Sequence, residues 1–202
     1  LFDVTQKPVW LEQSLQTART MCSLFRDDNT HDFHMTSPNH ETLLVRPKDV
    51  LDGAYPCGNS LAFQLLVRLE QLTMSGEFQG IVDRMAQEIR ATSARYPGGV
   101  ARGLEVEMGR SLPPARIVVT SAEPLHETLP ILTPLMQLYG PFRHVLLRTP
   151  ETANQLDVLC PHTGAYPIPE KGQQYYLCTG MSCRQPVQSA EAVLEMIAET
   201  GG

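Results

Sequence analysis

The chain has 202 residues, 42% of them hydrophobic, and is long enough to bury the core of one larger domain or of two small ones. Sixteen basic against 22 acidic residues give a net charge of −6, which argues against a general nucleic-acid binder and against a binder of anionic membranes. No apolar run approaches the roughly 20 residues that cross a bilayer, so we expect no membrane partner.

The cysteine count and the amino-terminal residues bear on where the protein works. Five cysteines are an odd number, so we expect a reducing compartment, the cytoplasm, and no secreted disulfide framework. The first residues, Leu1-Phe-Asp-Val, show neither an initiator Met nor the basic-then-apolar pattern of a signal peptide. We therefore expect the chain to continue upstream as part of a larger protein.

Amphipathic helices dominate the first half of the chain. Apolar residues recur at helical spacing over residues 8–26, 61–72 and 78–89. The short connector Ser75-Gly76 predicts an αα-hairpin of the second and third helices, which would form an antiparallel layer with the first. A further helix over residues 100–113 is weakened by two glycines, and Pro113-Pro114 predicts a boundary.

Beyond this boundary the pattern changes to strands. A β-branched run at 116–120, helical spacing over 124–139 and an apolar run at 143–147 predict a parallel βαβ unit. Pro130 and Pro134 predict a kink or a late start of its helix, because an interior proline costs about 3 kcal/mol.

A third strand over residues 173–178 and a last helix capped by Ser189 complete the second half. The expected fold class is therefore mixed α/β. An antiparallel helical region at residues 1–112 would be followed by a small α/β region at residues 113–202.

The stretch from Arg46 to Ser60 is dense in turn-forming and polar residues. Asp52-Gly53 predicts a turn, and Gly58 gives backbone freedom just before Asn59 and Ser60, either of which can cap the next helix. One interpretation is a well-formed loop and cap. The other is that Arg46, Lys48, Asp52 and Asn59 stand at the rim of a cleft, and the residues alone leave both open.

Two other segments carry weak signals for a ligand. His31 and His34 flank Asp32, but an extended segment points two residues at this spacing to opposite faces, so we expect no metal there. The turn after residue 120 stands where a βαβ unit can hold a phosphate, yet it contains no glycine and places Glu123 where the anion would sit.

The cysteine pair near the carboxyl-terminal end allows several interpretations. Four residues separate Cys178 and Cys183. In a thioredoxin-like motif only two residues separate the cysteines, and the motif lies at a helix N-terminus. With Cys160 and His162 they would make a zinc set, although structural zinc sites usually show tighter paired spacings. A reversible disulfide and two structural cysteines around a tight turn are the other interpretations. We assign no metal.

Several of these residues match a family pattern. The run from Leu43 to Ser60, LLVRPKDVLDGAYPCGNS, resembles a pattern in which DGA-x-PSGNS follows an R-x-K-D segment. Other landmarks match in the same order, namely Phe25-x-Asp27 with Phe33 and Thr36, and Tyr176-Leu-Cys178 with Cys183-Arg-Gln-Pro-Val187. The chain is similar over nearly its whole length to the C-terminal part of YyaL-type proteins, which are related to spermatogenesis-associated protein 20.

Three residues at two sites depart from this pattern. Cys57 stands where the family usually has Ser, which puts a hydroxyl role there in doubt, and His31-Asp32 replaces the usual Gly-Gly. The thioredoxin-like domain and the first part of the family's helical barrel have no counterpart in this chain.

The resemblance implies an architecture and partners. The family carries an N-terminal thioredoxin-like domain, a barrel similar to six-hairpin glycosidases and sugar epimerases, and a small C-terminal α/β region. The helices of this chain would then be the last part of an (α/α) barrel, with the upstream barrel and thioredoxin-like domains as partners in one longer protein. Because a partial barrel exposes apolar surface, we expect the chain to work within that protein or to pair with a second copy.

The resemblance also implies a function, one rim of a site for a sugar or another small polar ligand that is not catalytic alone. Asp52 would act as acid/base or hydroxyl anchor, Arg46 and Lys48 would hold an anionic group, and Asn59 and Ser60 would complete the ligand contacts. We expect no cofactor, and no reaction is named because no second carboxylate is evident.

Two other functions remain as alternatives. Cys178 and Cys183, or Cys57, would serve as thiol redox partner of the upstream thioredoxin-like domain. The chain would otherwise be a structural or interaction module without chemistry of its own.

Overall fold

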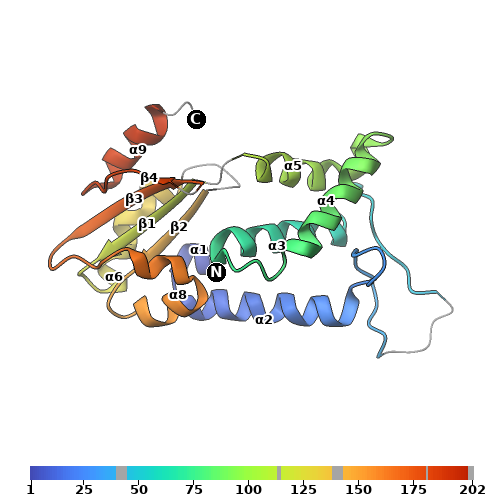
Figure 1. Ribbon diagram of the computed structural model, residues 1–202, viewed down its shortest axis with the longest axis horizontal. Coiled ribbons are helices and arrows are strands. Elements are labelled where there is room, and N and C mark those ends of the chain that lie inside the picture. Colours follow the sequence, from blue (N-terminus) through green and yellow to red (C-terminus); the bar gives the residue numbers. More distant parts are fainter. Residues whose placement is uncertain (40–44, 113–114, 138–142, 181, 200–202) are drawn as a thin grey trace. The chain divides into compact units, whose positions relative to one another are not determined.

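The computed structural model describes residues 1–39, 45–112, 115–137, 143–180 and 182–199 (Figure 1). The chain forms two compact units, which we call the helical unit (Gln13–Leu112) and the sheet unit (Leu1–Glu12 with Pro113–Gly202). The first twelve residues thus group with the sheet that follows much later in the sequence. The fold is mixed α/β, and every helix in the described ranges is too short or too polar to cross a bilayer.

The described residues of the helical unit form four helices and one 3-10 turn. They are most of α2 (Pro8–Phe25), α3 (Gly58–Thr73), α4 (Gln79–Ser93), η1 (Pro97–Val100) and α5 (Ala101–Arg110). α3 packs against α4 and α5, and α4 also packs against α5. The helices predicted from apolar spacing are confirmed, and their buried side chains include Phe63, Leu66, Leu69, Val82, Met85, Ile89 and Val106.

A glycine and a buried carboxylate explain how these helices fit together. A Cβ on Gly103 would lie 3.0 Å from Cδ1 of Ile89, so Gly103 lets α5 approach α4 closely. At the start of α4 the Glu70 carboxylate accepts hydrogen bonds from the backbone N–H groups of Gly76 (2.9 Å) and Phe78. Glu70 is 9% exposed, and it satisfies N–H groups that no helical carbonyl can reach.

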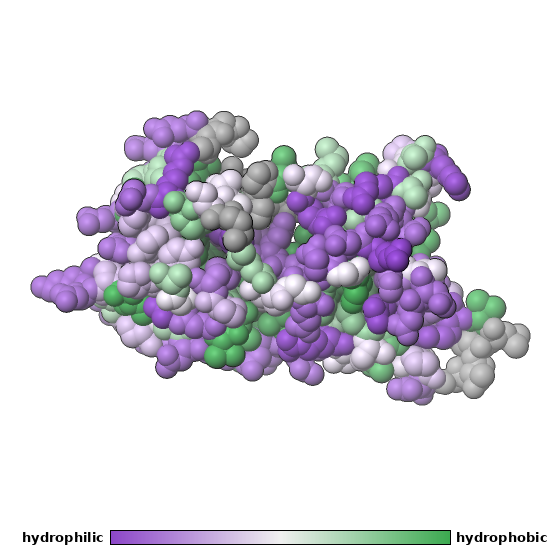
Figure 2. Space-filling view, in the orientation of Figure 1, coloured by the Kyte–Doolittle hydropathy of each residue, from purple (hydrophilic) through white to green (hydrophobic). Residues whose placement is uncertain are grey.

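The segment between α2 and α3 contains little regular structure. Isolated bridges join Arg26 to Phe33 and His34 to Lys48. From the sequence, residues 31–35 and their continuation at 41–45 are expected to form a short strand or loop, and residues 41–44 of it lie outside the described residues. Figure 2 shows hydrophilic residues over much of the visible face, with hydrophobic residues in small separate patches.

The sheet unit is organised around four strands. They are β1 (Ala115–Ser121), β2 (Arg143–Arg148), β3 (Gln173–Thr179) and β4 (Ser182–Cys183), in the order β2-β1-β3-β4. β1 runs parallel to β2 and antiparallel to β3, and β3 is antiparallel to β4. The parallel βαβ pair and the third strand predicted from the sequence are confirmed.

The connection from β1 to β2 is not one continuous helix. It is divided into α6 (Leu125–Thr128), η2 (Leu129–Leu132) and α7 (Thr133–Met136). Pro130 and Pro134 each lie in the first turn of a new segment, where a missing N–H costs little. The prolines therefore break the predicted helix into short pieces, and residues 138–139 of that prediction lie outside the described residues.

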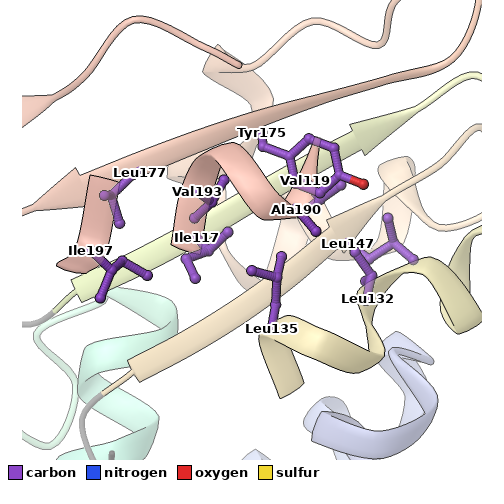
Figure 3. Packing of buried hydrophobic residues seen from close by; sticks show 10 residues of the cluster. All are labelled: Ile117, Val119, Leu132, Leu135, Leu147, Tyr175, Leu177, Ala190, Val193 and Ile197. Carbon is purple, nitrogen blue, oxygen red and sulfur yellow. The ribbon is translucent and has the colours of Figure 1, made fainter. Parts of the chain in front are cut away.

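The two faces of the sheet differ in what covers them. Figure 3 shows one face packed against α7 and α9 (Ala190–Glu199) through an apolar core that includes Ile117, Val119, Leu135, Tyr175, Leu177 and Val193. The start of α9 has the predicted cap, because the N–H of Ala192 donates to Ser189 Oγ at 3.2 Å. The opposite face carries Arg148, which pairs with Asp157 of α8 (Ala153–Leu159) at 2.6 Å.

The amino-terminal residues close the outer edge of β2. Gln6 follows α1 (Phe2–Thr5), has a φ of 51° and is 1% exposed. Its Oε1 accepts the backbone N–H of Leu147 at 2.9 Å. The side-chain amide thus takes the place of a neighbouring strand at this point of the edge.

Candidate functional site

Asp52 joins the N-termini of two helices. Its Oδ1 accepts the N–H of Cys57 at 2.9 Å, just before α3, and its Oδ2 accepts the N–H of Arg102 in the first turn of α5 at 2.8 Å. Burial acts to raise the pKa of Asp52, but these backbone hydrogen bonds outweigh it and the pKa is lowered. Both oxygens are engaged by backbone, which is a capping role. The predicted acid/base role stays a prediction.

The cap of α3 differs from the prediction. Cys57, and neither Asn59 nor Ser60, is the N-cap residue, and its Sγ accepts the N–H of Ser60 at 3.3 Å. The prediction was wrong because a thiol is a weaker acceptor than an amide or hydroxyl oxygen and gives no capping signal. Cys57 is 2% exposed and burial raises its pKa, both of which argue against a reactive thiol.

Asn59 acts as a partner for an extended stretch of backbone. Its Oδ1 accepts the N–H of Phe33 at 2.7 Å, and its Nδ2 donates to the carbonyls of Phe33 at 2.9 Å and Asp49 at 2.8 Å. The side chain is buried. The loop therefore uses all three of these hydrogen bonds to hold itself together, and a ligand contact by Asn59 stays a prediction.

Arg46 is bound by backbone carbonyls. Its Nε donates to Thr36 O at 3.1 Å, and its Nη2 donates to Leu24 O at 3.3 Å in the last turn of α2. The carbonyl of Arg46 in turn lies 3.2 Å from Nδ1 of His34. Arg46 and Asp52 therefore bind different parts of the loop and do not pair with each other.

Lys48 is engaged by two carboxylates of the same unit. Its Nζ lies 2.8 Å from Asp27 Oδ2 and 2.6 Å from Asp32 Oδ1. Burial acts to lower the pKa of Lys48, but the hydrogen bonds to these carboxylates outweigh it and the pKa is raised. The predicted anion-binding cation is thus already neutralised by side chains of the chain itself.

A small open pocket lies beside this loop in the helical unit. Its volume is about 210 Å³, and its wall is apolar at Val50, Leu51, Met85 and Ile89. Asn59 and Ser60 line it, whereas Arg46, Lys48 and Asp52 do not. It is also lined by Asp32 and Glu88, two carboxylates that were not predicted as ligand contacts.

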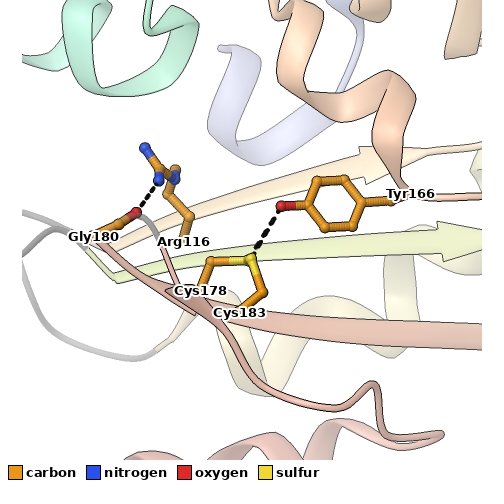
Figure 4. Close-up of a disulfide and its surroundings, with 5 residues drawn as sticks. All are labelled: Arg116, Tyr166, Cys178, Gly180 and Cys183. Carbon is orange, nitrogen blue, oxygen red and sulfur yellow. Dashed lines mark hydrogen bonds between the residues drawn. A yellow bond between two sulfur atoms is a disulfide. The ribbon is translucent and has the colours of Figure 1, made fainter.

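The cysteine pair of the sheet unit forms a disulfide across a hairpin. Cys178 of β3 and Cys183 of β4 are directly paired in the antiparallel register, and their sulfurs are bonded (Figure 4). Gly180, in the turn between the two strands, has a φ of 60°. Cys178 is 1% exposed, whereas Cys183 is exposed, so the bond has one buried and one accessible end.

The hydroxyl of Tyr166 lies over this disulfide. It is 3.3 Å from Cys178 Sγ and 3.2 Å from Cys183 Sγ. The ring packs against Tyr176 with centroids 4.8 Å apart. Arg148, which pairs with Asp157, also donates from Nη1 to the carbonyl of Tyr166 at 3.3 Å. The tyrosine is therefore held in place by both its ring and its backbone.

Arg116 completes the surroundings of the disulfide. Arg116 is directly opposite Cys178 in the β1–β3 register, and opposite residues of neighbouring strands point to the same face. Its Nη2 donates to the carbonyl of Gly180 in the hairpin turn (Figure 4). Burial lowers the pKa of Arg116, but a guanidinium stays protonated at neutral pH.

The zinc set considered from the sequence is not assembled. Two of its sulfurs, those of Cys178 and Cys183, are bonded to each other. Cys160 is fully buried, and burial raises its pKa to about 12, so it lacks the thiolate that zinc binds. Within the described ranges no group of three His, Cys, Asp or Glu side chains is arranged to hold a metal ion.

No protein-family model matches the chain, and no curated protein matches it. The family resemblance therefore stays a prediction from the motifs.

Tyr166 and Arg116 carry no sequence signal that would place them near the disulfide. Tyr166 stands in a loop-rich stretch without periodicity. Arg116 opens a predicted strand, and only the register of β1 against β3 places it opposite Cys178.

Proposed function

We propose that the sheet unit takes part in thiol–disulfide exchange through Cys178 and Cys183. The observation that carries this proposal is the asymmetry of the disulfide, which has a buried and an exposed end with one tyrosine hydroxyl in contact with both sulfurs. Exchange requires a thiolate to reach one sulfur, and exposed disulfides are the ones that serve regulatory or catalytic roles.

The odd cysteine count supports the same proposal. We infer a cytoplasmic location, where disulfides that do form are usually catalytic or redox-sensing. Cys22, Cys57 and Cys160 are free thiols, so the disulfide is one selected pair among five cysteines.

The test is a redox titration of the full chain in glutathione buffers. Samples are acid-quenched, unfolded and alkylated, and intact mass gives three modified thiols for the oxidised protein and five for the reduced one. A midpoint above about −300 mV supports exchange, because structural disulfides lie below about that value. A pair that stays oxidised in the native protein at that potential overturns the proposal.

A second candidate function is the binding of a small hydroxylated ligand in the pocket of the helical unit. It is favoured by the exposed carboxylate of Glu88 at an apolar wall, because small-ligand pockets combine apolar walls with a few polar groups that orient the ligand. Asp32 also lines the pocket, although Lys48 already binds its carboxylate. The carboxylate role predicted for Asp52 would then belong to Glu88, which is exposed at the pocket.

This candidate is tested by titrating monosaccharides and short oligosaccharides against the protein, with chemical shifts as the readout. We expect shifts at the pocket that weaken in Glu88→Gln. They should persist in the matched control Glu105→Gln, because Glu105 lies outside the pocket lining. Equal shifts in both variants would remove Glu88 from the site.

We infer, finally, that the chain is the C-terminal part of a YyaL-type protein and that its helices are the last part of an (α/α) barrel. The DGA-x-P-x-GNS run supports this, because Asp52, Cys57 and Asn59 all hold the loop that begins α3. An upstream thioredoxin-like domain would supply the dithiol for exchange, and a second copy of the chain is the other partner. The coding sequence upstream of Leu1 tests this, since a reading frame without such domains would contradict it.

A further inference from the structure

Four residues form one transverse row across the sheet. His144 of β2 is paired with Arg116 of β1, Arg116 with Cys178 of β3, and Cys178 with Cys183 of β4. Directly opposite residues point to the same face, so the buried Arg116 projects from the face that carries the disulfide, on the strand next to Cys178, and its guanidinium reaches the carbonyl of Gly180 (Figure 4). The side chain of Tyr166 lies against this face, and its hydroxyl is within hydrogen-bond distance of both sulfurs.

The two sulfurs of this bond are not equivalent. Cys183 is exposed and is the end that a thiol can reach, whereas Cys178 is 1% exposed. When one sulfur is attacked, the other leaves with the electron pair, and it leaves faster when its thiolate is stabilised. A buried thiolate needs a hydrogen-bond donor and a positive charge nearby. The Tyr166 hydroxyl, 3.3 Å from Cys178 Sγ, is such a donor, and Arg116 on the neighbouring strand carries the positive charge.

We infer that exchange at this pair has a direction: an incoming thiolate attacks Cys183 Sγ, and Cys178 leaves as a buried thiolate stabilised by the Tyr166 hydroxyl and the Arg116 guanidinium. This inference rests on the proposed exchange function and adds the order of the two cysteines and two positioning residues. Arg116 also donates to the carbonyl of Gly180, which joins its side chain to the hairpin turn.

Attack on the disulfide needs no reactant other than the incoming thiol. The attacking thiol first loses its proton to water, its sulfur forms a bond to Cys183 Sγ, and the bond between Cys183 and Cys178 breaks. The electron pair stays on Cys178 Sγ, which keeps the charge that the attacking thiolate brought. A second thiol on the same partner then releases Cys183 and completes reduction, so the partner class is a dithiol.

Three further titratable side chains on the described strands point to this face, those of Tyr176, Arg148 and His144. Tyr176 donates its hydroxyl to Gln174 Oε1 at 2.6 Å, and Arg148 is paired with Asp157. His144 lies one strand beyond Arg116 in the row. Tyr166 and Arg116 are therefore the groups whose removal tests the inference.

The test uses the oxidised full chain, reduced glutathione as the attacking thiol and N-ethylmaleimide to trap the thiol that is released. After a short reaction, peptide mapping is expected to find glutathione on Cys183 and maleimide on Cys178. Glutathione found mainly on Cys178 overturns the direction of attack.

The positioning residues are tested by variants that keep the fold. Tyr166→Phe keeps the ring against Tyr176 and removes only the hydroxyl, and its matched control Tyr176→Phe removes a hydroxyl that contacts no sulfur. We expect Tyr166→Phe and Arg116→Gln to slow release of Cys178 on the order of tenfold and to shift its alkylation profile to higher pH, with Arg116→Lys restoring most of the rate. Equal rates and alkylation profiles for Tyr166→Phe and Tyr176→Phe overturn the stabilising role.

Failure of the inference and failure of the proposed function give different results. If glutathione leaves the wild-type disulfide intact in the native protein, exchange itself is overturned. If exchange proceeds but glutathione is on Cys178, or the paired tyrosine variants behave alike, the proposed function stands and this inference is wrong.

Discussion

The loop before α3 and the β3–β4 hairpin are both rich in groups that can do chemistry, but they use them in opposite ways. In the loop, Asp52 and Asn59 direct their oxygens and nitrogens to backbone groups of their own unit. In the hairpin, the sulfurs of Cys178 and Cys183 meet a hydroxyl and the outer sulfur belongs to an exposed residue. The polar groups of the loop are thus occupied by backbone, whereas the hairpin keeps one cysteine of its disulfide exposed.

The largest loss of stability is expected from Asn59→Leu in the loop. The change leaves the N–H and carbonyl of Phe33 and the carbonyl of Asp49 without their buried partner, and each such group costs about 1–3 kcal/mol. We expect the free energy of unfolding to fall by about 3 kcal/mol or more in urea titrations. The exposed Asn29→Leu is the control, and an equal loss in both would show that Asn59 does not hold the loop.

The next effect is expected from Asp52→Ala. The N-termini of two helices lose the carboxylate that caps them. Because a single lost cap costs about 0.5–2 kcal/mol, we expect the free energy of unfolding to fall by about 2.5 kcal/mol. Urea unfolding followed by circular dichroism measures it, with the exposed Asp28→Ala as control. An Asp52→Ala variant that keeps wild-type stability but binds ligand more weakly would instead show that Asp52 is a site residue.

Removal of the hairpin disulfide is expected to lower the free energy of unfolding somewhat less. Replacing both cysteines by serine opens a short loop of six residues, for which chain entropy predicts a loss of about 2 kcal/mol. Hydrogen exchange of β3 amides measures the change locally. The reduced wild-type protein should match Cys178→Ser/Cys183→Ser, and a fully unfolded double variant would show that the disulfide is structural.

The smallest effect concerns acid sensitivity. The pKa of Asp52 is lowered in the folded state, so the unfolded chain binds more protons as the pH falls. The stabilisation by Asp52 is therefore complete above the ordinary aspartate pKa of about 4 and is lost as the pH falls through the folded-state value. Between about pH 5 and pH 3 we expect the free energy of unfolding of Asp52→Asn to fall less steeply than that of the wild type, as measured by urea unfolding at each pH. Equal slopes for the two proteins would contradict this.

Local periodicity was enough to predict most of the regular structure. The leucines of α3, the β-branched residues of β1 and the Ser189 cap are signals carried within a few residues, and each is confirmed. The division of the β1–β2 connection followed from two prolines whose effect is also local.

The candidate sites were less predictable because their partners are distant in the sequence. Asp52 binds Arg102 and Asn59 binds Phe33, and no local pattern specifies either contact. The Tyr166 hydroxyl reaches the disulfide only because the loop after α8 folds back over the sheet. The assignment of residues 1–12 to the sheet unit likewise depends on a contact with β2.

That contact has a consequence for how the chain folds. Gln6 and Leu147, which it joins, are 141 positions apart, and the whole helical unit lies between them in the sequence. During synthesis the helical unit is complete before β2 has been made, whereas the edge of the sheet must await a loop closure of high contact order. The helical unit is thus expected to fold first on the ribosome, and the amino-terminal residues to dock last, as the slow step of the sheet unit.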